Sequence, residues 1–125
     1  MLVEDEKEPR FKTRLLVQKG VEFIALKIED IVLLYTENRL VYAIDKNEKK
    51  YIVNKKLNQL EEELNTKTFF RANRQCIISI HYTRSFRTYE RVKLVVDLNL
   101  INFKFPVIIS QENAANFRKW ISEAE

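Results

Sequence analysis

One short polar segment between apolar stretches carries the side chains best suited to recognition chemistry. Phe69 and Phe70 precede it, the apolar run 76–78 follows it, and between them stand Arg71, Asn73, Arg74 and Gln75. Arginine, asparagine and glutamine provide the donors and acceptors that read guanine and adenine edges. Because burying such groups unpaired is costly, we expect a loop that leaves the core and presents them to solvent or to a ligand. The alternative is that these side chains form hydrogen bonds with neighbouring turns of the same chain.

Positive charge is concentrated around this segment. The chain has 125 residues and a formal net charge of +4, but residues 1–62 hold equal numbers of basic and acidic side chains. Residues 65–93 contain one acidic residue, Glu90, and seven basic ones: Lys67, Arg71, Arg74, Arg84, Arg87, Arg91 and Lys93. Such a local excess is typical of a surface that binds a polyanion. A solvated sheet face that is merely basic would give the same pattern.

The other residues that could do chemistry do not assemble an enzyme site. His81 is the only histidine, Cys76 the only cysteine and Gly20 the only glycine, which excludes the common multi-residue metal sites and glycine-rich phosphate loops. The acidic run 61–63 falls on a predicted helix, where consecutive side chains point about 100° apart and do not converge on one ion. We therefore expect no enzymatic activity, no cofactor and no metal, and we interpret Cys76 as a buried, inert thiol.

The first ten residues differ from the rest of the chain. They contain an acidic run that ends in Pro9 and has no hydrophobic periodicity, so we expect a linker or tail over 1–10 and one domain over 11–125. No signal-peptide pattern is present, and the longest apolar runs, such as 31–35, are far too short to span a membrane. These features predict a cytoplasmic protein without membrane contact.

Hydrophobic periodicity predicts the elements that must position the polar segment. Runs rich in β-branched and aromatic residues, separated by tight turns, predict an antiparallel meander of strands at 10–19, 21–28, 31–36, 40–45 and 49–53. Further strands are predicted at 71–72, 76–80, 84–89, 92–98 and 101–109. Leucine spacing predicts a helix over 55–64 with Asn54 as its N-cap, and a second helix over 111–122 follows Ser110. The predicted fold class is mostly β with two short helices.

Five features in a fixed order carry a resemblance to a known family. They are 28–31 leading into the strand that ends at Tyr35, the turn 36–39, the helix 57–64, the segment 70–75 followed by 78–79, and the residues 107–111 that open the last helix. Together they resemble the LytTR DNA-binding domain, the output module of many bacterial response regulators. The resemblance covers about 11–121. It implies an elongated antiparallel fold of several sheets, in which loops rather than a recognition helix meet the DNA.

The resemblance also implies which residues contact double-stranded DNA. One loop enters a major groove, a second region crosses the intervening minor groove, and a third reaches the next major groove. In that order the matching residues are Asn38 and Arg39; Asn73, Arg74 and Gln75, with Arg71 nearby as a candidate phosphate ligand; and Ser110 and Gln111.

Two of these positions depart from the residues commoner in the family. Gln111 stands where an arginine is commoner, so it can read adenine but brings no charge. The pair Arg74-Gln75 stands where arginine and serine are commoner, and we expect a different base preference there.

The partners implied by the resemblance lie partly outside this chain. A response regulator needs a receiver domain with a phosphorylatable aspartate, for which this chain has no room, and through it a sensor histidine kinase. Because the sequence contains no coiled coil, we expect a monomer in solution that pairs on repeated DNA half-sites. The alternative function is a protein–protein interaction module with a basic face, which would use an exposed edge at 103–106 or a groove lined by Phe69 and Phe70. A steep loss of affinity with salt would distinguish DNA binding from this alternative.

Overall fold

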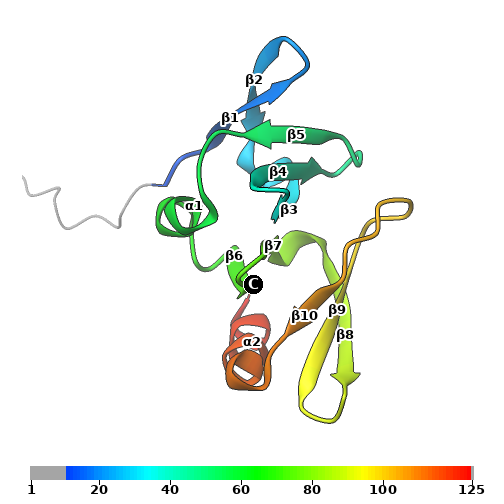
Figure 1. Cartoon of the computed structure of the whole chain (residues 1–125). Helices are drawn as coiled ribbons and strands as arrows, with labels where there is room; N and C mark the ends of the chain where they lie inside the picture. Colours follow the sequence, from blue (N-terminus) through cyan, green and yellow to red (C-terminus); the bar gives the residue numbers. More distant parts are fainter. Residues whose placement is uncertain (1–10, 125) are drawn as a thin grey trace, which may run out of the picture.

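The strands of the protein form two antiparallel sheets, seen in a computed structural model that describes residues 11–124 (Figure 1). The larger sheet has seven strands in the order β2-β1-β5-β4-β3-β7-β6, and the smaller has three in the order β10-β9-β8. The strands are β1 Arg14–Lys19, β2 Glu22–Lys27, β3 Ile31–Glu37, β4 Leu40–Asp45, β5 Lys50–Val53, β6 Phe69–Asn73, β7 Cys76–Ser79, β8 Thr83–Tyr89, β9 Lys93–Leu98 and β10 Val107–Ile109. The helices are α1 Leu57–Glu63 and α2 Gln111–Glu123. This confirms the predicted mostly-β fold with two short helices; the predicted linker 1–10 lies outside the described residues.

The strand β3 lies between β4 and β7 and is buried on both faces. Leu34 faces the side of the large sheet that α1 covers, whereas Leu33 and Tyr35 face the side that the small sheet covers. A strand buried on both faces gains from apolar side chains at every position, which explains the uninterrupted run of apolar residues in its sequence.

Two cores hold the elements together, one on each face of the large sheet. In the first, Leu57 and Leu60 of α1 pack on the sheet together with Leu64, which follows the helix. In the second, α2 and the small sheet pack on the opposite face around Phe117, which is fully buried. The ring of Phe117 lies 5.5 Å from that of Phe70 on β6 and 5.1 Å from that of Phe86 on β8, so α2 joins the two sheets.

Two details of the sequence-based prediction are wrong. Lys56, not Asn54, occupies the N-cap position of α1, and no side chain caps that helix. The predicted strand 101–109 is reduced to Val107–Ile109. The difference at α1 follows from packing: the helix begins at Leu57, the first residue whose side chain enters the core, and Asn54 is left exposed before it.

The segment that precedes β10 folds back onto the large sheet instead of forming a strand. The carboxylate of Glu48, in the turn between β4 and β5, accepts hydrogen bonds from the backbone N–H groups of Ile101, Asn102 and Phe103 at 2.6, 2.9 and 2.7 Å. These N–H groups are therefore unavailable to a strand partner. The bonds from Ile101 and Phe103 lower the pKa of the Glu48 carboxyl below its ordinary value.

Candidate nucleic-acid interface

The turn between β3 and β4 consists of Asn38 and Arg39. Both residues have positive φ, 52° and 69°, which is the geometry of the tight two-residue turn that matches the twist of a hairpin. The strands close below them at the pair Glu37 and Leu40, and the Thr36 hydroxyl donates to the Leu40 carbonyl at 3.0 Å. Asn38 and Arg39 are both exposed. The hairpin backbone alone therefore presents these two side chains to solvent.

The polar segment that was expected to be a loop is a second tight hairpin. Arg71 and Asn73 belong to β6, and only Arg74 and Gln75 form the turn to β7. The side chains of Arg74 and Gln75 are exposed, whereas Arg71 and Asn73 are partly buried. The segment thus divides into an inner pair and an outer pair with different surroundings.

Arg71 uses its guanidinium within the protein. Its Nε donates to the Asn73 carbonyl at 2.7 Å, and one terminal nitrogen donates to the Arg74 carbonyl at 2.8 Å. The other terminal nitrogen donates to Asn58 Oδ1 at 2.9 Å and to Glu61 Oε1 at 2.8 Å, both on α1. Four of its five N–H donors are therefore engaged. The turn and α1 therefore supply acceptors for most of the guanidinium that was expected to be a phosphate ligand.

Both the nitrogen and the oxygen of the Asn73 side-chain amide form hydrogen bonds. Its Nδ2 donates to the carbonyl of Ile108 on β10 at 2.8 Å, and its Oδ1 accepts from the backbone N–H of Gln75 at 2.7 Å. The thiol of Cys76 donates to the same oxygen at 3.6 Å. The side chains of Arg71 and Asn73 thus bond to the turn itself, to α1 and to β10, and they hold the turn that carries Arg74 and Gln75. Their predicted contact with DNA stays a prediction.

The third predicted contact lies where β10 passes into α2. Ser110 occupies the N-cap position of this helix, but its hydroxyl makes no capping bond, and Gln111 is the first helical residue and is exposed. The N-terminus of a helix directs unsatisfied backbone N–H groups outward, a geometry that suits a phosphate oxygen.

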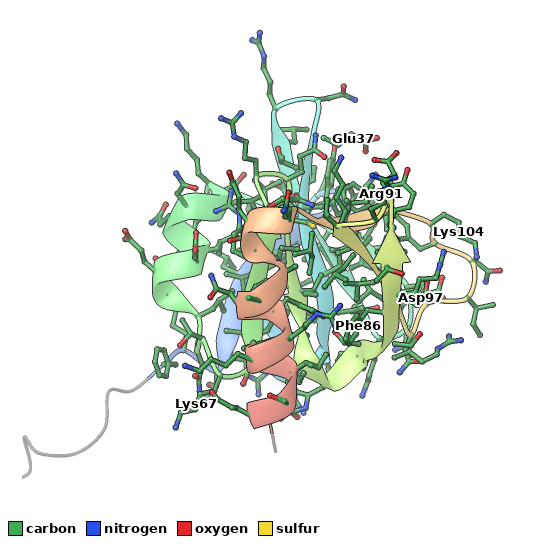
Figure 2. The ribbon with its side chains drawn as sticks, turned by 90° about the horizontal axis from the view of Figure 1, so that it is seen from below. Glu37, Lys67, Phe86, Arg91, Asp97 and Lys104 are labelled. Atoms are coloured by element: carbon green, nitrogen blue, oxygen red, sulfur yellow. The ribbon has the colours of Figure 1, made fainter. Side chains whose placement is uncertain are left out.

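Two hydrogen bonds place the three segments in one row. The Thr36 N–H at the end of β3 donates to the Gln75 carbonyl at 2.9 Å, which sets the β3–β4 turn beside the β6–β7 turn. The bond from Asn73 to Ile108 sets the β6–β7 turn beside the end of β10. Figure 2 shows Glu37, at the end of β3, on the same side as the start of α2, while Lys67 lies at the opposite side. Segments far apart in the sequence therefore share one surface.

A hollow of about 310 Å³ lies between the first two turns. Arg39 and Arg74 line it, and so does the exposed Lys56, which precedes α1. Lys56 was not among the predicted site residues, because only the packing of α1 beside these turns brings it there.

Fewer basic side chains of 65–93 are free of an acidic partner in the folded protein than the sequence suggests. Three of the seven form ion pairs: Arg71 with Glu61, Arg87 with Asp97 and Lys93 with Glu90. Within residues 11–124, no acidic partner lies within ion-pair distance of the other four, which are Lys67, Arg74, Arg84 and Arg91.

The residues considered for catalysis do not come together. Burial raises the pKa of the Cys76 thiol to about 12, so the thiol stays protonated and inert. Glu61 and Glu63 pair with different cations, Arg71 and Lys55, and His81 is exposed. Across residues 11–124, no group of three or more potential ligands is arranged to hold a metal ion. The helices of that part of the chain include none long and apolar enough to cross a bilayer.

The protein is a mostly-β module with exposed turns on one side, and comparison with known proteins gives its family. The family model of the LytTr DNA-binding domain matches residues 22–122. The chain therefore belongs to this family of DNA-binding domains, which is not a family of enzymes.

A solved structure agrees with this assignment. It is the LytTr DNA-binding domain of a Bacillus cereus protein that carries the name of a methyl-accepting/DNA response regulator. The two chains are 17% identical and superpose with a TM-score of 0.76 over 88% of this chain and 97% of the other. A comparison with curated protein sequences gave no match.

Proposed function

We propose that the row formed by the three turns binds double-stranded DNA sequence-specifically, with successive segments entering successive grooves. The observation that carries this proposal is the pair of hydrogen bonds that aligns the segments, from Thr36 to Gln75 and from Asn73 to Ile108. A row of exposed turns can follow a duplex across several grooves, whereas separated turns cannot.

The residues divide between two roles. Base edges and phosphates are contacted by the exposed side chains of the row, which are Asn38, Arg39, Arg74, Gln75 and Gln111, and by the partly exposed Ser110. Arginine forks suit guanine edges and phosphates, and the amides suit adenine. Arg71 and Asn73 act as positioning residues, because their side chains are engaged within the protein. Lys56 adds a cation between the first two segments.

The wider context is transcription regulation as the output domain of a two-component response regulator. The membership of the chain in the LytTr DNA-binding family supports the regulatory role. In this proposal the protein acts in the cytoplasm, and a receiver domain outside the chain, controlled by a sensor histidine kinase, governs when the domain occupies its site.

A binding titration tests the proposal most directly. Duplexes selected from a random pool supply the site, and affinity is then measured over a range of salt concentrations. Arg74→Ala should weaken binding by about 1–3 kcal/mol. The matched control is Lys67→Ala, which removes an exposed cation at the opposite side of the molecule and should bind as the wild type does. Wild-type binding by Arg74→Ala would remove the central turn from the interface.

The assembly on DNA has its own test. We propose that the free domain is a monomer and that two copies occupy repeated half-sites spaced by about one helical turn, ~10 bp. Inserting half a turn between the half-sites should abolish joint occupancy, since it rotates the second copy to the opposite side of the duplex. Sedimentation with one-site and two-site duplexes measures this. A tight dimer without DNA would contradict it.

The surfaces suggested for the alternative, a protein–protein interaction module, differ in the structure: Phe69 and Phe70 do line a hollow of about 420 Å³, but most of these aromatic side chains also pack within the protein. Phe103 and Phe105 pack on the ring of Tyr35, with ring centroids 5.5 and 4.7 Å away, and 103–106 forms no strand edge. Phe69 is buried, and the ring of Phe70 packs edge-on against Phe117 and at a tilt against Trp120.

A further inference from the structure

The turn between β8 and β9, formed by Glu90, Arg91 and Val92, lies next to the third segment of the row. In the small sheet Ile109 pairs with Leu94, so β10 runs toward the start of β9 and ends beside the β8–β9 turn. Arg91 lies three residues before Leu94, which places it on the order of 10 Å beyond the last β9–β10 pair at ~3.3 Å per residue. Figure 2 shows Arg91 on the same side as Glu37 and opposite Lys67.

Arg91 is exposed and has no partner among residues 11–124. The basic residues near it are neutralised: Arg87 pairs with Asp97 at 3.0 Å and Lys93 with Glu90 at 3.3 Å. The guanidinium of Arg91 forms neither an ion pair nor a side-chain hydrogen bond in this part of the chain. The turn therefore presents one uncompensated cation.

Glu90 and Arg91 adopt a left-handed backbone conformation that is unfavourable for their residue types. Glu90 and Arg91 have φ of 48° and 72°, values that asparagine or glycine adopts at lower cost. Their φ values resemble those of Asn38 and Arg39 in the β3–β4 turn. Both turns thus have an arginine at positive φ in second place, although the β8–β9 turn has a third residue, Val92.

The third segment lacks the charge that the other segments have. The first turn presents Arg39 and the second presents Arg74, but Ser110 and Gln111 are uncharged and Glu112 follows them. A row that lies along a polyanion would therefore have no cation of its own at this end. Arg91 is the cation that the strand register brings to that place.

We propose that Arg91 binds a phosphate of the DNA backbone beyond the third segment and so supplies the positive charge that Ser110 and Gln111 do not. This inference rests on the proposed function. A phosphate is favoured over a base edge because Val92 offers no hydrogen bond and Glu90 is held by Lys93. The turn therefore offers a single guanidinium fork, which suits two phosphate oxygens.

The test is a salt titration of DNA affinity with Arg91→Asn, a neutral residue that tolerates the positive φ and so keeps the turn folded. Because each neutralised phosphate contributes about 0.9 to the slope of log affinity against log salt, the slope should fall by about that amount. The loss should be the same on single-base variants of the site. Arg91→Lys should retain most of the slope, and Lys67→Ala should retain all of it.

A second measurement uses shortened duplexes. Removing base pairs at the end of the site nearest the third segment should weaken wild-type binding and abolish the difference between wild type and Arg91→Asn. Removing base pairs at the other end should preserve that difference.

Distinct outcomes overturn distinct claims. An unchanged slope for Arg91→Asn, while Arg74→Ala weakens binding, would overturn the role of Arg91 alone. A loss confined to one base pair would replace the phosphate contact with a base contact and overturn the assignment. If Arg74→Ala and Arg91→Asn both bind as the wild type does, the proposed interface itself is wrong.

Discussion

The β3–β4 turn and the β6–β7 turn lie side by side and present similar side chains, yet they are held in different ways. Each is a two-residue turn with one exposed arginine and one exposed amide side chain. The first is held by its own hairpin backbone, with positive φ at Asn38 and Arg39. The second is held by side chains, because Arg71 and Asn73 tie it to α1 and to β10.

Because of this difference, substitutions at the two turns should affect protein stability and DNA binding to different extents. At the β3–β4 turn the exposed side chains are not part of the support, so a substitution there should change binding alone. At the β6–β7 turn the supporting residues, Arg71 and Asn73, directly precede the presented ones in the same hairpin, so a substitution in β6 should change both folding and binding.

The largest effect is expected from Arg71→Ala. The substitution removes four hydrogen bonds and leaves the carbonyls of Asn73 and Arg74 without their partner, so the free energy of unfolding should fall by on the order of 2 kcal/mol. Urea unfolding followed by circular dichroism measures this, and DNA affinity should fall with it. Arg74→Ala should leave the unfolding midpoint unchanged. Equal midpoints for the two variants would show that Arg71 does not hold the β6–β7 turn.

A smaller effect is expected from Asn73→Asp. The aspartate keeps the oxygen that accepts from the Gln75 N–H, but it replaces the donor to the Ile108 carbonyl with an acceptor. Stability should fall by about 1–2 kcal/mol, because two acceptors then face each other. On DNA, discrimination should weaken first at base pairs read by Ser110 and Gln111, since the bond to β10 positions them. Uniform weakening over the whole site would contradict this link.

At the first turn, Asn38→Gly should change recognition without changing stability. Glycine accepts the φ of 52° and removes only the side chain. Discrimination should fall by about 1 kcal/mol at one base pair and stay constant elsewhere. Affinity on a panel of single-base variants measures this, with unfolding as the control. A loss spread evenly over the panel would show that Asn38 only orients the backbone on DNA.

The smallest effect concerns Glu48, which belongs to neither turn and so tests stability apart from recognition. Because its pKa is lowered in the folded state, its contribution to stability is present above the ordinary carboxyl pKa and is lost as pH falls through the lowered value. The stability difference between wild type and Glu48→Gln should therefore be constant near neutral pH and shrink on acidification. Glu62→Gln, on the exposed face of α1, controls for the loss of one charge. A difference independent of pH would show that the charge of Glu48 is irrelevant to these bonds.

The sequence determined the elements of this protein wherever local rules dominate. Strand alternation in 22–27 and 40–45, the turn at Asn38 and Arg39, and the leucine spacing of α1 depend on neighbours in the chain, and the structure confirms them. The order of motifs also carried the resemblance to the family to which the chain belongs. Composition excluded the common metal and nucleotide sites before any contact was known.

Only the tertiary structure decided which polar side chains are presented and which are used as support. Arg71 and Arg74 are three residues apart in one polar segment, and nothing in that segment reveals that α1 provides Asn58 and Glu61 as acceptors for the first. The place of Arg91 depends on the register of β9 with β10, and the short β10 depends on Glu48, more than fifty residues away. Such contacts join segments distant in the sequence, so their energies have no local signature, and a pattern read along the chain does not contain them.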